Sequence, residues 1–290
     1  MKTMPPYNET QPVFFLHIPR TGGTTLDAIF FQNIEPQKVI RVYSKSEYER
    51  HTLHSIDELA QIRFITGHLF LDSYDPPAIY KTRVNAFTFL RDPVERLVSE
   101  YIFYKTWPNQ HLYSVLNERK ISFAEYLTSR EPIFIYRGKN FMTRALSGKS
   151  FKAESYPYAA LAMAKRVLEK NFFSFGLLER FDESLLLLNR TVHLNSILYL
   201  KRNKLMANRK ETISDDDRAL AAELNRADAS LYAFAEELFE SRVRDAGCDF
   251  PMQVAAFREK NSLYRKVARQ LGAEATQLSD GIQLSKDSIW

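Results

Sequence analysis

Short apolar runs alternate with helical patterns along most of this chain. The runs have the length and composition of buried strands and cover residues 13–17, 63–66, 85–90 and 173–177. Apolar residues recur at helical spacing in residues 24–33, 93–105, 158–170, 182–192, 215–244 and 252–271. Because buried strands separated by helices are typical of a parallel sheet covered on both faces, we expect a three-layer α/β fold.

The polar ends of the chain suggest a division into three parts. Residues 1–12 are predicted to form an N-terminal tail, and residues 13–247 a single α/β domain. Residues 248–290 are predicted to add a helical extension that ends in a tail rich in Ser, Asp and Gln. The pattern over 215–244 predicts one long amphipathic helix that packs on the core.

Composition narrows the class of protein. The chain has 290 residues, of which 45% are hydrophobic, and this is ample for a full core. Its net charge of +5 suits an anionic ligand, but basic and acidic residues are interspersed, which does not favour nucleic-acid binding. A single cysteine, Cys248, excludes an internal disulfide. No apolar run approaches the ~20 residues of a membrane span, and the N-terminus lacks the apolar core of a signal peptide, so we expect a soluble cytoplasmic protein.

The stretch from residue 14 to 25, which reads FFLHIPRTGGTT, predicts an anion site. An apolar strand runs into a tight turn at 19–23, and a helix can begin at Thr24. Backbone N–H groups of a glycine-rich turn and a helix start form a cradle for phosphate-like groups, and Arg20 adds a positive charge. The loop is not a Walker A sequence, since it lacks G-x-x-x-x-G-K-[ST]. An ordinary Gly-Gly turn that binds no ligand remains the alternative interpretation.

A second anion site is predicted after the run at 85–90. Arg91 emerges at the carboxyl end of that strand, where parallel sheets bind ligands, and Ser99 lies two turns into the next helix. An arginine can hold a phosphate through two N–H groups, and a serine can donate its hydroxyl. Asp92 precedes Pro93 and is interpreted as the N-cap of that helix, so the strand end offers a cation to a ligand rather than a carboxylate to Mg²⁺. A structural ion pair for Arg91 and a solvated hydroxyl for Ser99 remain the alternatives.

Together these motifs resemble the sulfotransferases that use PAPS, 3′-phosphoadenosine-5′-phosphosulfate. The resemblance covers most of residues 13–246 and is strongest to the carbohydrate branch, which includes heparan sulfate 2-O- and 6-O-sulfotransferases and soluble bacterial relatives. Supporting segments are Thr66-Gly-His68, residues 91–99, 142–146 and 175–179, and a basic loop near Lys201. The resemblance implies a P-loop-like three-layer fold with a central, mainly parallel sheet flanked by helices.

The resemblance also implies roles for particular residues. The first loop would grip the 5′-phosphosulfate of PAPS, through Arg20, Thr21, Gly22, Gly23, Thr24 and Thr25. Arg91 and Ser99 would hold the 3′-phosphate. Lys201 and Arg202 of the basic loop are weaker candidates for contact with the cofactor or the acceptor, and are equally well explained as surface charges. Glu100, beside Ser99, is interpreted as facing either solvent or the acceptor.

The implied reaction is an in-line transfer of a sulfuryl group from PAPS to an acceptor hydroxyl, with no metal. His68 is the candidate base, since an imidazole titrates near neutral pH and the histidine follows an apolar run. A structural histidine is the alternative. Arg20 stands where the family usually carries lysine, and an arginine can stabilise charge without donating its proton. The expected acceptor is a carbohydrate or glycoconjugate.

Two other functions remain open at this point. A phosphotransferase on a related fold would need Mg²⁺ and the Walker lysine and aspartate, which the sequence does not show at the two motifs. A protein that binds PAP or another polyanion without catalysis is suggested only by Arg20 in place of the family lysine.

Overall fold

The computed structural model describes residues 5–43, 46–47, 49, 56–68, 84–148, 157–201 and 212–272. Its centre is a five-stranded sheet in the order β2-β3-β1-β4-β5, and all of its strand pairs are parallel. The strands are β1 (Val13–Leu16), β2 (Val39–Val42), β3 (Phe64–Gly67), β4 (Asn85–Leu90) and β5 (Ser174–Leu177). This sheet confirms the predicted parallel α/β fold.

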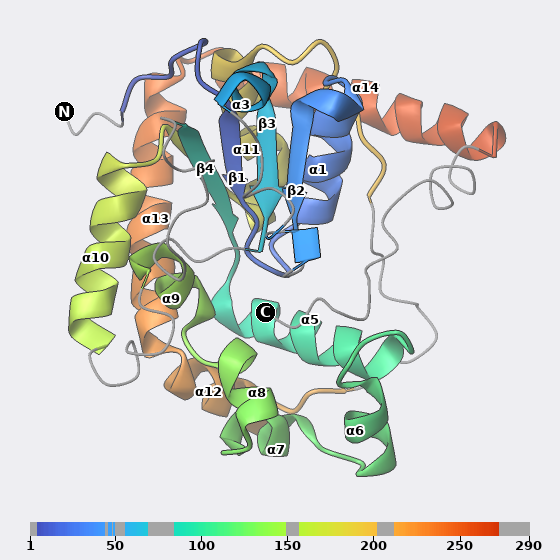
Figure 1. Cartoon of the computed structure of the whole chain (residues 1–290), viewed down its shortest axis with the longest axis vertical. Helices are drawn as coiled ribbons and strands as arrows, with labels where there is room; N and C mark the ends of the chain where they lie inside the picture. The colour runs from blue at the N-terminus through green and yellow to red at the C-terminus, as the bar shows by residue number, and fades with distance from the viewer. Residues whose placement is uncertain are drawn as a thin grey trace.

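Helices cover both faces of the sheet. Helices α9, α10 and α13 lie on one face, and α1 and α11 lie on the other (Figure 1). The helices in the described residues are α1 (Gly23–Phe31), α3 (Ile56–Gln61), α5 (Pro93–Thr106), α6 (Tyr113–Glu118), α7 (Phe123–Thr128), α8 (Pro132–Gly138), α9 (Phe141–Ser147), α10 (Pro157–Lys170), α11 (Phe181–Val192), α12 (Asp215–Leu224), α13 (Arg226–Asp245) and α14 (Phe250–Gln270), with 3-10 turns η1 (Pro36–Lys38) and η2 (Leu178–Arg180).

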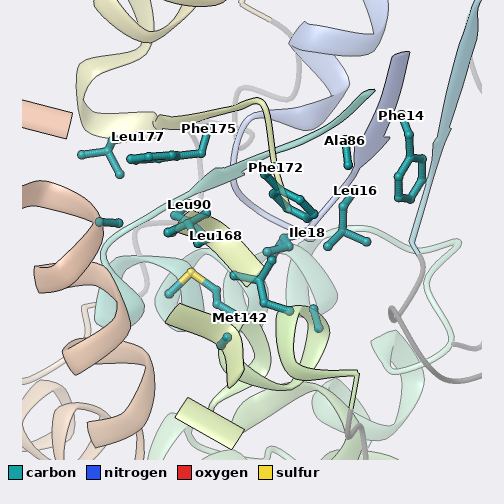
Figure 2. Packing of buried hydrophobic residues seen from close by; sticks show 14 of the residues in the cluster. Phe14, Leu16, Ile18, Ala86, Leu90, Met142, Leu168, Phe172, Phe175 and Leu177 are labelled. Atoms are coloured by element: carbon teal, nitrogen blue, oxygen red, sulfur yellow. The ribbon is translucent and has the colours of Figure 1, made fainter. Parts of the chain in front are cut away.

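Strand β1 shows why the sheet is buried on both sides. Its alternate residues point to opposite faces, so Phe14 and Leu16 enter one apolar cluster while Phe15 enters the other. In Figure 2, Leu16 lies beside Ile18 and faces Met142 of α9 across the first cluster. Burying one such side chain stabilises the fold by about 1.5–3 kcal/mol, so the two clusters fix the position of β1 between the helical layers.

The position of β1 also determines where a ligand can bind. Leu16 aligns with Gly67 of β3 on one side and with Thr88 of β4 on the other. The chain leaves β1 toward β2 and β3, and then returns to the opposite side of β1 at β4. The loops after β1 and β4 therefore diverge at neighbouring strand ends, which is where open parallel sheets bind ligands.

Several elements differ from the sequence prediction. Strand β2 is absent from the prediction because its apolar run is only four residues and contains Arg41. The helix predicted over 215–244 is two helices, α12 and α13, which break at Asn225. The buried Asn225 side chain accepts a hydrogen bond from Asn140 N at 2.7 Å and donates one to the carbonyl of Ala221 at 2.9 Å. Tertiary hydrogen bonds thus override a helical period that continues across the break.

Helix α14, within the predicted extension, packs on the main body. Phe250, Val254 and Phe257 are buried in the two sheet clusters, and Asn261 Oδ1 accepts a hydrogen bond from Tyr199 N at 2.9 Å. The domain boundary at residue 247 stays a prediction. Among the described helices, none is both long and apolar enough to cross a bilayer.

A third cluster, formed mainly by α5, α6, α7 and α12, lies at the carboxyl-end side of the sheet (Figure 1). It contains a buried ion pair in which Arg96 Nη1 donates to Glu100 Oε2 at 2.7 Å. The hydroxyl of Tyr126 donates to Glu100 Oε1 at 2.6 Å. The interpretation of Glu100 as facing solvent or acceptor was therefore wrong: its carboxylate is buried and fixes α5 to α7.

Candidate functional site

A cavity of about 390 Å³ lies at the carboxyl ends of β1 and β4. It brings together eight of the residues singled out from the sequence, namely Arg20, Gly22, Gly23, Thr24, Thr25, Arg91, Ser99 and Lys201. Its other lining residues are His17, Leu178, Glu179, Phe181, Asp182, Tyr199 and Arg258. The two predicted anion motifs thus share one cavity.

The turn after β1 requires glycine at position 22. Gly22 has a φ of 90°, in the left-handed region, and it is the N-cap of α1. A Cβ at this position would also lie 2.7 Å from Leu178 Cδ1. Thr21 is fully buried, and its hydroxyl donates to the carbonyl of Ile18 at 2.8 Å, so Thr21 stabilises the turn and is not among the lining residues.

Gly23, the first residue of α1, is in close contact with an imidazole. A Cβ built on Gly23 would lie 2.0 Å from His17 Nε2. The first turn of α1 lies at the cavity, which Gly22, Gly23, Thr24 and Thr25 line. The missing side chain therefore lets His17 and the start of α1 approach each other beside the predicted phosphate cradle.

Replacing Gly23 by alanine is expected to weaken PAP binding at least tenfold, because the added methyl group would displace either the His17 ring or the helix start. Isothermal titration calorimetry with PAP would measure the change. Gly138→Ala is the matched control, since a Cβ there meets nothing within 4 Å. Equal PAP affinity in the two variants would contradict a ligand at the start of α1.

Arg20 does not extend freely into the cavity. Its Nε donates to Ser99 Oγ at 3.0 Å, and its guanidinium lies 4.5 Å from the centre of the Phe103 ring. Burial, and then the nearby charge of Arg91, lower the pKa of Arg20 to about 10. The guanidinium therefore keeps its charge at neutral pH, and Ser99, which accepts this bond, keeps its hydroxyl proton for another acceptor.

Arg91 joins the end of β4 to the turn after β1. Its Nη1 donates to the carbonyl of Arg20 at 3.2 Å, and its Nε is 4.0 Å from Glu179 Oε1. Burial lowers the pKa of Arg91, although Glu179 opposes the change. The predicted cap is confirmed, since Asp92 Oδ1 accepts a hydrogen bond from Glu95 N at 2.8 Å. Burial lowers the pKa of both guanidiniums, and the charge of Arg91 lowers that of Arg20 further, so an anion bound beside them would be favoured.

Another part of the cavity wall is aromatic and is connected to α14. The rings of Phe181 and Tyr199 pack edge to face with centres 5.0 Å apart. The hydroxyl of Tyr199 donates to Asp182 Oδ1 at 2.8 Å, and Arg258 Nε of α14 donates to Asp182 Oδ2 at 3.1 Å. This wall offers aromatic side chains, and Lys201 adds a cation to the lining of the same cavity.

His68 follows β3, where its N–H donates to the carbonyl of Val42 at 3.1 Å. It is half-buried and is not among the cavity-lining residues. Its ring packs against that of His17, with centres 4.6 Å apart, and against that of Tyr43 at 4.8 Å. His17 is therefore the imidazole that lines the cavity, and His68 packs against His17 without lining the cavity itself. Arg202 lies outside the described residues.

Sequence reasoning missed the lining residues outside the two motifs. His17 had a local signal, as a polar residue that ends an apolar strand directly before the turn. Tyr199 and Arg258 had none, since a tyrosine in an irregular segment and an arginine on an amphipathic helix are ordinary features. Their place in the cavity follows from the packing of α14 against α11.

A parallel sheet with a glycine turn, a helix start and two guanidiniums at its switch point defines an α/β protein whose site is suited to phosphate-type anions. The family model of galactose-3-O-sulfotransferase matches residues 1–285, and the chain belongs to this family. The predicted resemblance to the carbohydrate branch of the sulfotransferases is confirmed at this level.

Individual relatives agree with the family. Galactose-3-O-sulfotransferase 3 of Mus musculus and that of Homo sapiens are each 26% identical to the chain over 268 residues, covering 85% of this chain and 60% of the relative. The chain thus spans about 60% of the length of these relatives. A crystal structure of mouse sulfotransferase SULT7A1 complexed with PAP covers 75% of this chain and 65% of its own, with 15% identity and a TM-score of 0.34.

Proposed function

We propose that this protein transfers a sulfuryl group from PAPS to a hydroxyl of a galactose-containing carbohydrate. The observation that carries the proposal is the single cavity that both predicted anion motifs line in a member of the galactose-3-O-sulfotransferase family. PAPS carries anionic groups on both sides of its ribose, and the lining of the cavity includes the glycine turn and the cations Arg20, Arg91 and Lys201.

The donor nucleotide would bind across the cavity. The start of α1 with Gly22 and Gly23 would receive the 5′-phosphosulfate, which the tight approach of neighbouring side chains to both glycines supports. Arg91 and Ser99 would hold the 3′-phosphate. The partly exposed ring of Phe181 would supply an apolar surface for the adenine.

In the proposed reaction, the acceptor oxygen loses its proton to a base and forms a bond to sulfur. The bond between sulfur and the bridging oxygen of PAPS breaks, and PAP leaves with the electron pair. His68 is proposed as the base, supported by its position after β3 and beside His17 at the same edge of the sheet. Arg20 would stabilise the charge that develops on the leaving phosphate.

Exchanging Arg20 tests the residue at which this chain departs from the family pattern. Arg20→Lys keeps the charge but loses the stacking on Phe103, and we expect its turnover to stay within about tenfold of wild type. Arg20→Gln removes the charge and should lower turnover roughly 10²-fold or more. Steady-state rates at saturating PAPS would measure both. Equal turnover in Arg20→Gln and wild type would remove Arg20 from charge stabilisation.

The proposed activity is tested with labelled PAPS and a panel of acceptors, with and without EDTA. We expect transfer to galactose-terminated oligosaccharides that EDTA does not inhibit, and no transfer from ATP. Transfer from ATP that EDTA abolishes would instead identify a phosphotransferase. PAP binding without transfer to any galactose-containing acceptor would favour a binding protein without catalysis. The cytoplasmic location stays a prediction, to be checked by fractionation of expressing cells.

A further inference from the structure

His17 is held in one orientation by a buried chain of polar groups. Its Nδ1 lies 2.8 Å from the Tyr43 hydroxyl and 3.5 Å from Asp27 Oδ2. The Tyr43 hydroxyl also bonds to Asp27 Oδ2. Thr66 Oγ1 bonds to Asp27 Oδ1 at 2.8 Å. Together with the stacking of His17 on Phe15, with centres 5.2 Å apart, these contacts fix the plane of the imidazole.

Counting the protons in this group of hydrogen-bonded side chains identifies the tautomer of His17. Tyr43 and Thr66 have one hydroxyl proton each, and both hydroxyls donate to the carboxylate of Asp27. The Tyr43 oxygen must then accept from His17, so Nδ1 carries a proton. The other ring nitrogen, Nε2, is the atom that faces Gly23 at the start of α1.

The charges around His17 favour a proton on Nε2 once an anion is bound. Asp27 is buried and lies behind the ring, while the cradle lies on the other side. A protonated imidazole between a buried carboxylate and a bound anion is stabilised from both sides. Its Nε2–H would donate a charge-assisted hydrogen bond to the anion.

We propose that His17 is a ligand of the phosphosulfate end of the donor, with Asp27 and Tyr43 positioning the ring so that a protonated Nε2 donates to an oxygen in the cradle. The proposal rests on the proposed function, since it takes PAPS as the occupant of the cavity. It assigns His17 a role separate from that of His68: a proton on His17 disfavours a second positive charge on His68, whose ring centre is 4.6 Å away.

Other charged groups also lie around His17. Arg41 of β2 lies 5.7 Å from the Tyr43 ring centre, and Glu47 accepts a hydrogen bond from Tyr43 N at 2.7 Å. Arg20 lines the cavity, and its pKa of about 10 keeps it charged through the range in which an imidazole titrates. A change of affinity between about pH 6 and 9 would thus come from an imidazole or from the phosphates of the ligand.

The test compares PAP affinity of wild type and His17→Asn by calorimetry between about pH 6 and 9. Asparagine keeps a donor toward Tyr43 but lacks Nε2. We expect the variant to bind about tenfold more weakly near pH 6, and the difference in affinity to shrink at higher pH, because an unprotonated Nε2 cannot donate to the anion. Titration of the ligand phosphates is common to both proteins and cancels in the ratio.

Controls separate this outcome from a structural effect. His193→Asn is the matched surface control, because His193 is exposed and has a φ of 55°, a conformation that asparagine tolerates. His68→Asn should keep the pH-dependent affinity. Wild-type binding measured in two buffers of different ionisation enthalpy should show proton uptake, a readout that does not depend on whether His17→Asn folds.

An affinity gap that is constant with pH, or no proton uptake by wild type anywhere in this range, would overturn the role of His17 while leaving the proposed function in place. Failure of wild type to bind PAP at any pH would overturn the proposed function, and this inference with it.

Discussion

Replacing His68 by asparagine is expected to lower turnover roughly 10²–10⁴-fold, the usual contribution of a general base. PAP affinity should change little, because His68 is not among the residues that line the cavity. A loss confined to turnover indicates an interaction made only in the transition state. Rates at saturating PAPS and acceptor, together with calorimetry for PAP, measure the two quantities separately.

The same measurements on His193→Asn provide the control for the substitution itself. Unchanged turnover in His68→Asn would remove His68 from the mechanism. If His17→Asn instead lost turnover by the larger factor at every pH, the base would be His17, which lines the cavity, and not His68.

Replacing Glu100 by alanine is expected to lower the free energy of unfolding by about 3–5 kcal/mol, because the guanidinium of Arg96 would lose its ion-pair partner inside the protein. The hydroxyl of Tyr126 would lose its acceptor as well. Small domains have total stabilities of only about 5–15 kcal/mol, so this loss should be large in urea denaturation.

An exposed ion pair gives the matched control. Glu131 contacts Arg119 with N···O at 2.6 Å, but both side chains are about half exposed. Glu131→Ala should therefore leave the denaturation midpoint nearly unchanged. A loss in Glu100→Ala no larger than that in Glu131→Ala would show that the buried pair contributes little. If Glu100→Ala does not fold, adding Arg96→Met should restore folding, since it removes the uncompensated charge.

The sheet could be predicted from the sequence because its strands are buried on both faces. Strand β4 was predicted with its observed bounds, since six consecutive buried residues end at a charged one. Strand β2 could not be found, because a four-residue run containing Arg41 has too little periodicity. The break at Asn225 depends on its bond to Asn140, a contact that no local pattern encodes.

The cavity also contains residues that could be predicted from the sequence and residues that could not. The glycine turn and Arg91 could be predicted because each follows a strand directly, and the register of β1 and β4 then places them together. Thr21 was predicted to face the ligand, but its hydroxyl bonds to the carbonyl of Ile18 instead. This contact depends on how the turn closes and could not be predicted from the sequence. Arg258 needed the tertiary packing of α14 and was missed for that reason.

Arg258 has a consequence for how the protein is made. The turn at residues 17–25 and Arg258 line one cavity although they lie near opposite ends of the described chain. All five strands of the sheet are available once β5 has left the ribosome, but the wall of the cavity is complete only after α14 has been synthesised and has docked on α11. The full cavity thus forms only after α14 has docked, and a ligand that binds only the docked state would stabilise this step.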